Sequence, residues 1–223
     1  MSHDLDLASN TIGGLLSDLS RLPRGSGMPA APTGFSPLDT VLDGGFIPQE
    51  LILLGGRPGV GKTLTALQWA RSVAGANRTV AFVCYEHDEV ALLGRLIIQE
   101  VAALHPEIDA TAMVSLRNVV RELTMGLRTV DQLRLAHPAI DDALTSLGHN
   151  ASHLNLFRAS TQWSDTNWLA EVVVQHLRPG GVLVVDYLQK VPVQGFPDTR
   201  EQVMRATEAL KDLAVSADIS VVA

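Results

Sequence analysis

The stretch that decides the fold is GGRPGVGKTLTALQWA, residues 55–70. Gly56, four further residues and then Gly61-Lys62-Thr63 match the pattern G-x-x-x-x-G-K-[ST] at every fixed position. An apolar run precedes this segment, and the apolar periodicity after it predicts a helix. In that setting glycines let backbone N–H groups converge on phosphate oxygens at a helix N-terminus, which favours negative charge. The segment therefore predicts a phosphate-binding loop (P-loop).

The P-loop pattern assigns a role to each of its polar side chains. Lys62 is expected to reach the β- and γ-phosphates, and the Thr63 hydroxyl is expected to bind Mg²⁺. The predicted ligands are therefore ATP and Mg²⁺. The predicted nucleotide-binding residues are Gly56, Arg57, Pro58, Gly59, Val60, Gly61, Lys62, Thr63 and Leu64.

A second anchor for the metal ion is expected from a carboxylate at the end of an apolar strand. The segment GVLVVDYLQ, residues 181–189, supplies Asp186 at that place. The structural alternative is that Asp186 only ends a strand and begins a turn. Because no other carboxylate fits the need better, we predict that Asp186 supports the metal ion together with Thr63.

Hydrolysis further needs a group that polarises the attacking water. P-loop proteins commonly use a Glu directly after the metal-binding Asp or a Glu at the end of the neighbouring strand. Tyr187 follows Asp186, so the first arrangement is absent. The segment AFVCYEHDE ends a strand with Glu86, which is the predicted base and, with Lys62, a predicted catalytic residue. The alternative is a solvated loop carboxylate or a helix-capping charge.

The composition limits the other classes of protein. The net charge of −7 argues against a broad basic surface for nucleic acid, although a small local one is compatible with it. We expect no membrane-spanning segment, because no apolar run is long enough. Cys84, the single cysteine, rules out an internal disulfide and suits a reducing, cytoplasmic location; on an apolar strand it is expected to be buried. His149 and His153 lack a carboxylate or thiol companion for a metal.

Short β-rich runs alternate with helical periodicity, which predicts an α/β fold with a mostly parallel central sheet and helices on both faces. Continuously apolar strands are expected for parallel strands covered on both sides. The region 105–150 reads as helical and carries no recognisable chemistry. The predicted strands are 51–55, 79–85, 154–158, 182–186 and 219–223, and the predicted helices are 62–74, closed by Gly75, then 88–104 and 199–215.

Three segments are expected along the chain. Residues 1–22 contain an amphipathic helix over 12–22, residues 23–32 form a Pro/Gly/Ala linker, and residues 33–223 form the core. The helix either folds back on its own domain or docks on a neighbour.

Helix starts are also expected at two places. Ser36 is predicted to cap a turn that begins with Pro37, and Asp198 with Glu201 forms a capping-box pattern.

Four segments together resemble the RecA-like ATPase domain of DnaB-type replicative helicases, over about residues 33–223. The segments are TGFSPLDTVLDGGFIPQELILLGGRPGVGKT, FVCYEHDEVALLGRLI, LVVDYLQKV and REQVMRATEALKDLAVSADISVVA. The narrowing comes from Asp-Tyr-Leu-Gln at 186–189, because the P-loop and TGFSPLD are shared more widely, also with RadA- and KaiC-like ATPases.

The resemblance implies a RecA-like P-loop NTPase that hydrolyses ATP between subunits of a homo-oligomeric, hexameric ring and moves along single-stranded DNA in replication. It implies that Lys62 and Thr63 hold phosphate and Mg²⁺, that Glu86 activates water and that Asp186 supports the metal ion. Gln189 would lead from that site toward the central channel. The loop KVPVQGFPDTR, residues 190–200, would line the channel, with Lys190 and Arg200 as candidate DNA contacts.

The resemblance also carries departures. Family members continue after the strand at 219–223 with a sensor residue, further strands, DNA-contacting loops and an arginine that completes the neighbour's site. The chain is therefore expected to be truncated at its C-terminal end, with the strand at 51–55 left as an exposed sheet edge. The helix at 12–22 resembles the family's linker helix in position. Alternative functions are a RadA- or KaiC-like ATPase in recombination or signalling, or an ATP-binding module without efficient hydrolysis.

Overall fold

The computed structural model describes residue 12, residues 29–193, residue 195 and residues 198–223. Five parallel strands form one sheet in the order β1-β5-β4-β2-β3, so the predicted α/β fold with a parallel sheet is confirmed. The strands are β1 (Leu51–Ile52), β2 (Val80–Cys84), β3 (Leu154–Arg158), β4 (Val182–Asp186) and β5 (Ser220–Val222). Each of the five predicted strands is present.

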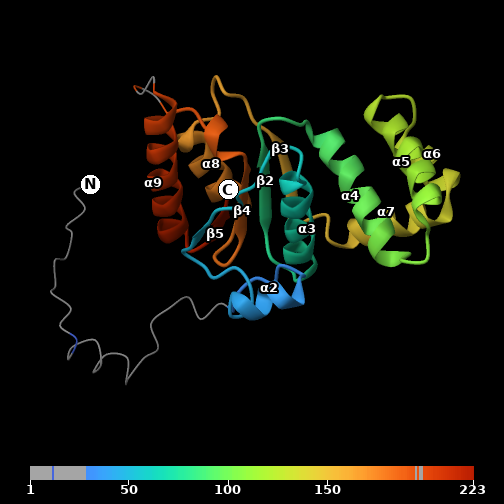
Figure 1. Ribbon diagram of the computed structural model, residues 1–223, viewed down its shortest axis with the longest axis horizontal. Coiled ribbons are helices and arrows are strands. Elements are labelled where there is room, and N and C mark those ends of the chain that lie inside the picture. The colour runs from blue at the N-terminus through green and yellow to red at the C-terminus, as the bar shows by residue number, and fades with distance from the viewer. Residues whose placement is uncertain (1–11, 13–28, 194, 196–197) are drawn as a thin grey trace.

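Helices cover both faces of the sheet, as predicted (Figure 1). On one face lie α2 (Ser36–Val41), α3 (Lys62–Gly75) and α4 (Glu89–Leu104), and on the other lie α8 (Thr166–His176) and α9 (Thr199–Ala217). Successive residues of β2 serve different faces: Val80 and Phe82 pack in the first core, and Ala81 and Val83 pack in the second. This two-sided burial explains why β2 and β4 are continuously apolar.

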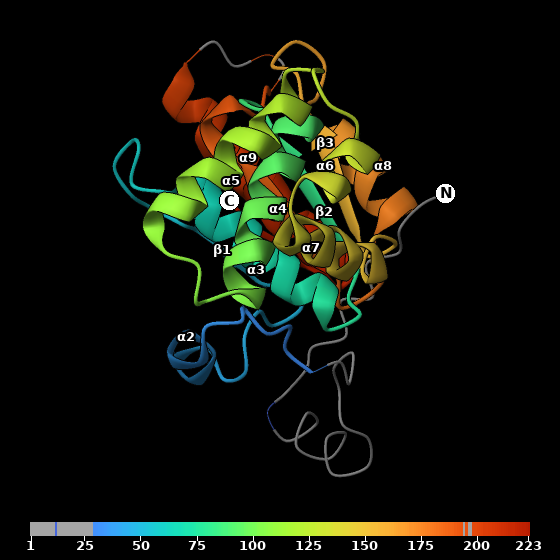
Figure 2. The ribbon, with the colours of Figure 1, turned by 90° about the vertical axis from the view of Figure 1, so that its right-hand side faces the viewer.

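The region 105–150 forms a helical group with its own core, which confirms the helical expectation for it. It contains α5 (Ala110–Thr124), α6 (Val130–Ala136) and α7 (Pro138–His149), which pack with one side of α4 (Figure 2). Leu133 and Ile140 are fully buried in this core, together with Ile97 and Val101 from α4. Helix α4 therefore belongs to two cores at once, since its Leu92 faces the sheet.

Several predicted element ends are corrected. Phe35, not Ser36, is the N-cap of α2, and Ser36 is already the first helical residue. The polar contact at this turn comes instead from Asp39, whose Oδ1 accepts hydrogen bonds from the backbone N–H of Thr33 (2.8 Å) and from its hydroxyl (2.6 Å). A carboxylate satisfies two donors there, which the Ser36 hydroxyl does not do.

Helices α3 and α9 end differently from the expectation. Gly75 is the last residue of α3 rather than its stop, and the chain turns at Asn77 in the left-handed region (φ 58°). Helix α9 extends to Ala217 and ends at Asp218 (φ 54°). Its start agrees with the prediction, because Asp198 accepts a hydrogen bond from the backbone N–H of Glu201 at 3.0 Å.

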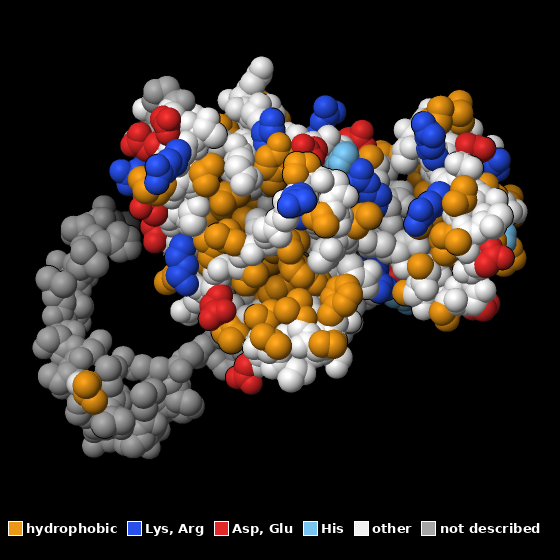
Figure 3. Space-filling model, in the orientation of Figure 1, with side chains coloured by type: hydrophobic (Ala, Val, Ile, Leu, Met, Phe, Trp, Pro, Cys, Tyr) orange, Lys and Arg blue, Asp and Glu red, His pale blue; other side chains and the backbone are white. Residues whose placement is uncertain are grey.

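Strand β1 lies at an edge of the described sheet, and β5 separates it from β4, as expected. The strand is shorter than the predicted 51–55, although the N–H of Leu54 still donates to the carbonyl of Ala223 at 2.8 Å. Leu53 is 59% exposed. In the orientation of Figure 1, Figure 3 shows hydrophobic side chains gathered over the region between β5 and α2. No described helix combines the length and apolar character that a membrane crossing requires.

The predicted amphipathic helix at 12–22 lies outside the described residues except for Ile12, and so does the first part of the predicted linker. At the end of that linker, Ala31 is buried and exchanges two backbone hydrogen bonds of 2.8 Å with Phe46. Phe46 in turn packs edge-on against Trp69 of α3. The first described residues after position 28 thus contact the core, while the proposed segment boundaries remain predictions.

Leu133→Ala tests whether the α5–α7 core contributes to folding. Leu133 is fully buried on α6, so the truncation removes apolar contacts and leaves a cavity, and we expect a loss of about 2–5 kcal/mol in the free energy of unfolding. Urea denaturation monitored by circular dichroism measures this loss. The matched control is Leu135→Ala on the same helix, whose side chain is 89% exposed and should change stability by less than about 0.5 kcal/mol. Equal effects of the two substitutions would contradict the separate core.

Candidate nucleotide-binding site

The P-loop connects β1 to α3 and has the backbone conformation that its glycines allow. Gly59 (φ 76°) and Gly61 (φ 103°) are in the left-handed region, where a side chain is strained. Gly61 is the N-cap of α3, and no side chain caps this helix start within the described residues. The first N–H groups of α3 are therefore available to an anion.

Lys62 folds back over the loop that precedes it. Its Nζ donates to the carbonyl oxygens of Gly56 at 2.9 Å and Arg57 at 3.1 Å. These two contacts hold the ammonium group above the turn. The predicted position of the charge relative to the backbone donors is thus the one that a phosphate site requires.

Asp186 and Thr63 meet although they lie 123 positions apart in the sequence. The Thr63 hydroxyl donates to Asp186 Oδ2 at 2.8 Å, at the junction of α3 and the end of β4. Hydroxyl and carboxylate oxygens are ligands that suit Mg²⁺, which usually keeps several waters and takes few protein ligands. The structure thus brings the two predicted metal ligands together, and their chemistry fits the ion.

Cys84 joins the ends of β2 and β4. It is the register partner of Asp186, and its Sγ donates to Asp186 Oδ2 at 3.4 Å. Burial raises the pKa of the Cys84 thiol to about 11, so the thiol is protonated near neutral pH and is able to donate. The predicted burial of Cys84 is confirmed.

Glu86 follows β2 in a turn that is held at several points. The N–H of Tyr85 donates to the carbonyl of Asp186 at 2.8 Å, and the Tyr85 hydroxyl donates to the carbonyl of Ser164 at 2.6 Å. Burial raises the pKa of Tyr85, which keeps this hydroxyl protonated. The Glu86 side chain itself is exposed. Because β2 and β4 end in register, Glu86 lies on the same edge of the sheet as Asp186.

One cleft of about 780 Å³ brings these residues together. Of the predicted site residues, it is lined by Gly56, Pro58, Gly59, Gly61, Lys62, Thr63, Leu64, Glu86 and Asp186. Arg57 and Val60 belong to the same loop but do not line the cleft, and their contact with nucleotide remains a prediction. Gln189, which the resemblance linked to this site, lines the cleft as well.

The cleft also contains residues that the sequence did not indicate: His87, Arg95, Tyr187 and Leu188. His87 directly follows the predicted base, so its position gave a signal that no motif explained. Arg95 is placed on α4, and only the packing of α4 beside α3 brings it to the cleft. That packing includes a hydrogen bond of 2.7 Å from Gln99 Nε2 to the carbonyl of Leu64.

The two candidate DNA contacts lie outside the cleft. Lys190 is exposed at the end of the short 3₁₀ turn η1 (Leu188–Lys190), with its Nζ 5.9 Å from the centre of the Tyr187 ring. Arg200 is exposed in the first turn of α9. The connection between them contains positions 194 and 196–197, which are outside the described residues. A role in DNA binding therefore remains a prediction.

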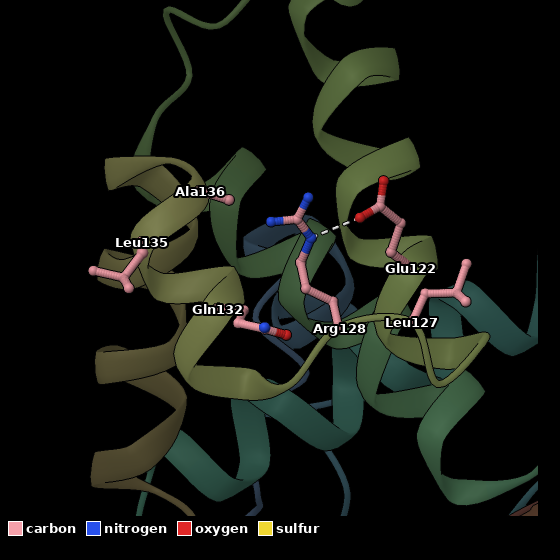
Figure 4. A pocket seen from close by; sticks show the side chains of 6 residues that line it. All are labelled: Glu122, Leu127, Arg128, Gln132, Leu135 and Ala136. Carbon is pink, nitrogen blue, oxygen red and sulfur yellow. Dashed lines mark hydrogen bonds and ion pairs between the residues drawn. The ribbon is translucent and has the colours of Figure 1, made fainter.

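A second hollow lies on the helical group, at α5 and α6 (Figure 4). An ion pair of 2.6 Å between Arg128 and Glu122 crosses it, and Leu135 stands at its side. It shares no lining residue with the P-loop cleft. Within the described part of the chain, no three His, Cys, Asp or Glu side chains form a metal-holding group, and His149 is exposed at the end of α7.

Comparisons with known proteins agree with this geometry. The chain is 30% identical over 157 residues to the DNA repair protein RadA of Haemophilus influenzae, covering 70% of this chain and 33% of that protein. It is 26% identical over 221 residues to the replicative DNA helicase DnaB of Nostoc sp., covering 96% of this chain and 22% of that protein. The chain thus spans a third or less of the length of these two relatives.

Two solved structures share the fold. One is an isolated ATPase domain, which superposes with a TM-score of 0.67 at 20% identity, covering 94% of this chain and 68% of that one. The other is a DnaB-like replicative helicase, described with its interactions with primase, which superposes with a TM-score of 0.68 at 19% identity, covering 98% and 48%. Both likenesses show the RecA-like ATPase fold. Because the family model of the DnaB-like helicase C terminal domain matches residues 30–223, the chain belongs to that family.

Proposed function

We propose that the cleft binds ATP with Mg²⁺ and hydrolyses it. The observation that carries this proposal is the hydrogen bond between Thr63 and Asp186, since it unites the P-loop with a carboxylate from a distant strand. Membership of a helicase family supports nucleotide binding in general. The free N–H groups at the start of α3 and the ammonium of Lys62 support binding of a phosphate chain in particular.

The residues of the cleft divide the work. The P-loop amides and Lys62 bind and orient the phosphates, while Thr63 and Asp186 would hold Mg²⁺. When bound, the metal ion neutralises charge on the phosphates. Glu86 stands beyond β2, where it accepts a proton from the attacking water. Cys84 and Tyr85 fix the turn that carries Glu86 relative to Asp186.

We further propose that hydrolysis drives a DnaB-like motor in DNA replication. In this proposal copies of the chain assemble as a ring, hexameric by family resemblance, in the cytoplasm, and the ring moves along single-stranded DNA. Lys190 and Arg200 are the proposed phosphate contacts, because both are exposed cations near the end of the sheet that carries Asp186. The similarity to a replicative helicase over 221 residues supports this proposal.

A second candidate is a RadA-like ATPase of DNA repair. The 30% identity to a DNA repair protein over 157 residues favours it. A third is a module that binds ATP without efficient turnover. An arginine supplied by a neighbouring subunit contributes about 10³ to 10⁵ in rate in related phosphoryl-transfer sites, so turnover depends on assembly.

Lys62→Ala tests the phosphate site. The substitution removes the cation above the P-loop, and we expect ATP affinity to fall at least about tenfold, because hydrogen bonds from charged groups contribute about 1.5–3 kcal/mol. Equilibrium titration with a fluorescent ATP analogue measures the affinity. Lys211→Ala is the matched control, since Lys211 is exposed and donates to the carbonyl of Gln49 away from the cleft. Unchanged affinity and turnover in the Lys62 variant would refute the assignment.

Glu86→Gln tests the proposed base. The amide keeps the size of the side chain but accepts protons poorly, so ATP binding should persist while turnover falls about 10²- to 10⁴-fold. Phosphate release under saturating Mg-ATP reports turnover. Glu89→Gln on the next turn is the control, because its Oε1 contacts the N–H of Arg158 and does not line the cleft. Turnover that survives the Glu86 substitution would remove Glu86 from the mechanism.

The ATPase rate with and without single-stranded DNA separates the candidate functions. The motor proposal expects stimulation by DNA that weakens as salt rises, because phosphate contacts release counterions. Lys190→Ala combined with Arg200→Ala should then reduce the stimulation and leave the DNA-independent rate unchanged. Binding and turnover of ATP without any response to DNA would contradict the motor, and binding without turnover would favour the third candidate.

A further inference from the structure

The wall of the cleft opposite the P-loop contains an unpartnered donor. This wall is the segment between β2 and α4, and it contributes Glu86, His87 and, from α4, Arg95. The His87 side chain is partly buried. Among the described residues its imidazole has no hydrogen-bond or ion-pair partner. A neutral imidazole always carries one N–H donor, and a protonated one carries two.

The backbone of His87 is fixed on both sides. Its N–H donates to Cys84 Sγ at 3.3 Å, and the preceding turn is tied to β4 through the N–H of Tyr85. The following residue, Asp88, is the N-cap of α4 and accepts from the N–H of Ala91 at 2.7 Å. Because this turn is already ordered, a ligand that bonds the imidazole loses little free energy in ordering it.

The charges that line the cleft leave room for a further donor. Lys62 and Arg95 are cationic, whereas Glu86 and Asp186 are anionic, so the two pairs offset each other. A nucleoside triphosphate brings one more phosphoryl group than a diphosphate. In the proposed function this terminal group lies toward Glu86, which acts on the water that attacks it. His87 follows Glu86 directly and lines the same cleft.

We propose that His87 donates a ring N–H to the terminal phosphate of the bound nucleotide and so favours nucleoside triphosphates over diphosphates. This inference rests on the proposed nucleotide site. Hydrogen bonds to phosphate oxygens are charge-assisted and are among the stronger ones in proteins. The contact selects the triphosphate because a diphosphate, bound by the P-loop in the same way, lacks the group that accepts it.

The test compares the affinities of a non-hydrolysable ATP analogue and of ADP, both with Mg²⁺, for the full chain by isothermal titration. His87→Leu should weaken binding of the analogue about three- to tenfold, or about 0.7–1.4 kcal/mol, and should leave ADP binding within twofold. His87→Gln keeps an N–H donor and should recover most of the preference. His149→Leu replaces an exposed histidine outside the cleft and should behave as the wild type.

The outcomes separate this inference from the function on which it rests. An equal loss of ATP-analogue and ADP affinity in His87→Leu, or no loss of either, would overturn the role of His87 while the nucleotide site stands. A preference that His87→Gln fails to restore would also count against a donated hydrogen bond. If the wild-type chain binds neither nucleotide, the proposed function fails and this inference fails with it.

Discussion

The hydrogen bond from Thr63 to Asp186 is the contact on which the arrangement of the site depends. It joins the first turn of α3 to the end of β4, and therefore fixes the P-loop against the middle of the sheet. Parallel pairing of β2 with β4 then places Cys84 beside Asp186 and the Glu86 turn above them. A short chain of hydrogen bonds thus sets the positions of the phosphate-binding loop, the metal ligands and the proposed base.

The sheet supplies the rigidity that this arrangement needs. Every residue of β2 and β4 is buried, with alternate side chains packed on opposite faces. The functional groups stand at the carboxyl ends of these strands, where loops leave the packed layers and side chains reach a cleft. Open α/β sheets commonly bind ligands at such an edge. Functional groups on short turns next to buried strands are held more firmly than groups on long loops.

Helix α4 connects the cleft to the helical group of α5–α7. One side of it packs toward the sheet through Leu92, and another side packs with Leu133 and Ile140 in a separate core. Arg95 on the same helix lines the cleft, and Gln99 bonds the carbonyl of Leu64 at the start of α3. A displacement of the helical group would therefore act on α4 and, through it, on both walls of the nucleotide site.

The sequence by itself determined the features that depend on neighbouring residues. Local spacing identified the loop at 56–63, two-sided burial made β2 and β4 recognisable as apolar runs, and Asp88 and Asp198 marked helix starts. Only the tertiary structure decided what distant segments do together. The pairing of Thr63 with Asp186 was predicted as a shared role, but its geometry, and the entry of His87 and Arg95 into the cleft, follow from packing between elements far apart in the chain. Helix ends such as Ser36 and Gly75 were misjudged because capping depends on which partner a backbone group finds in three dimensions.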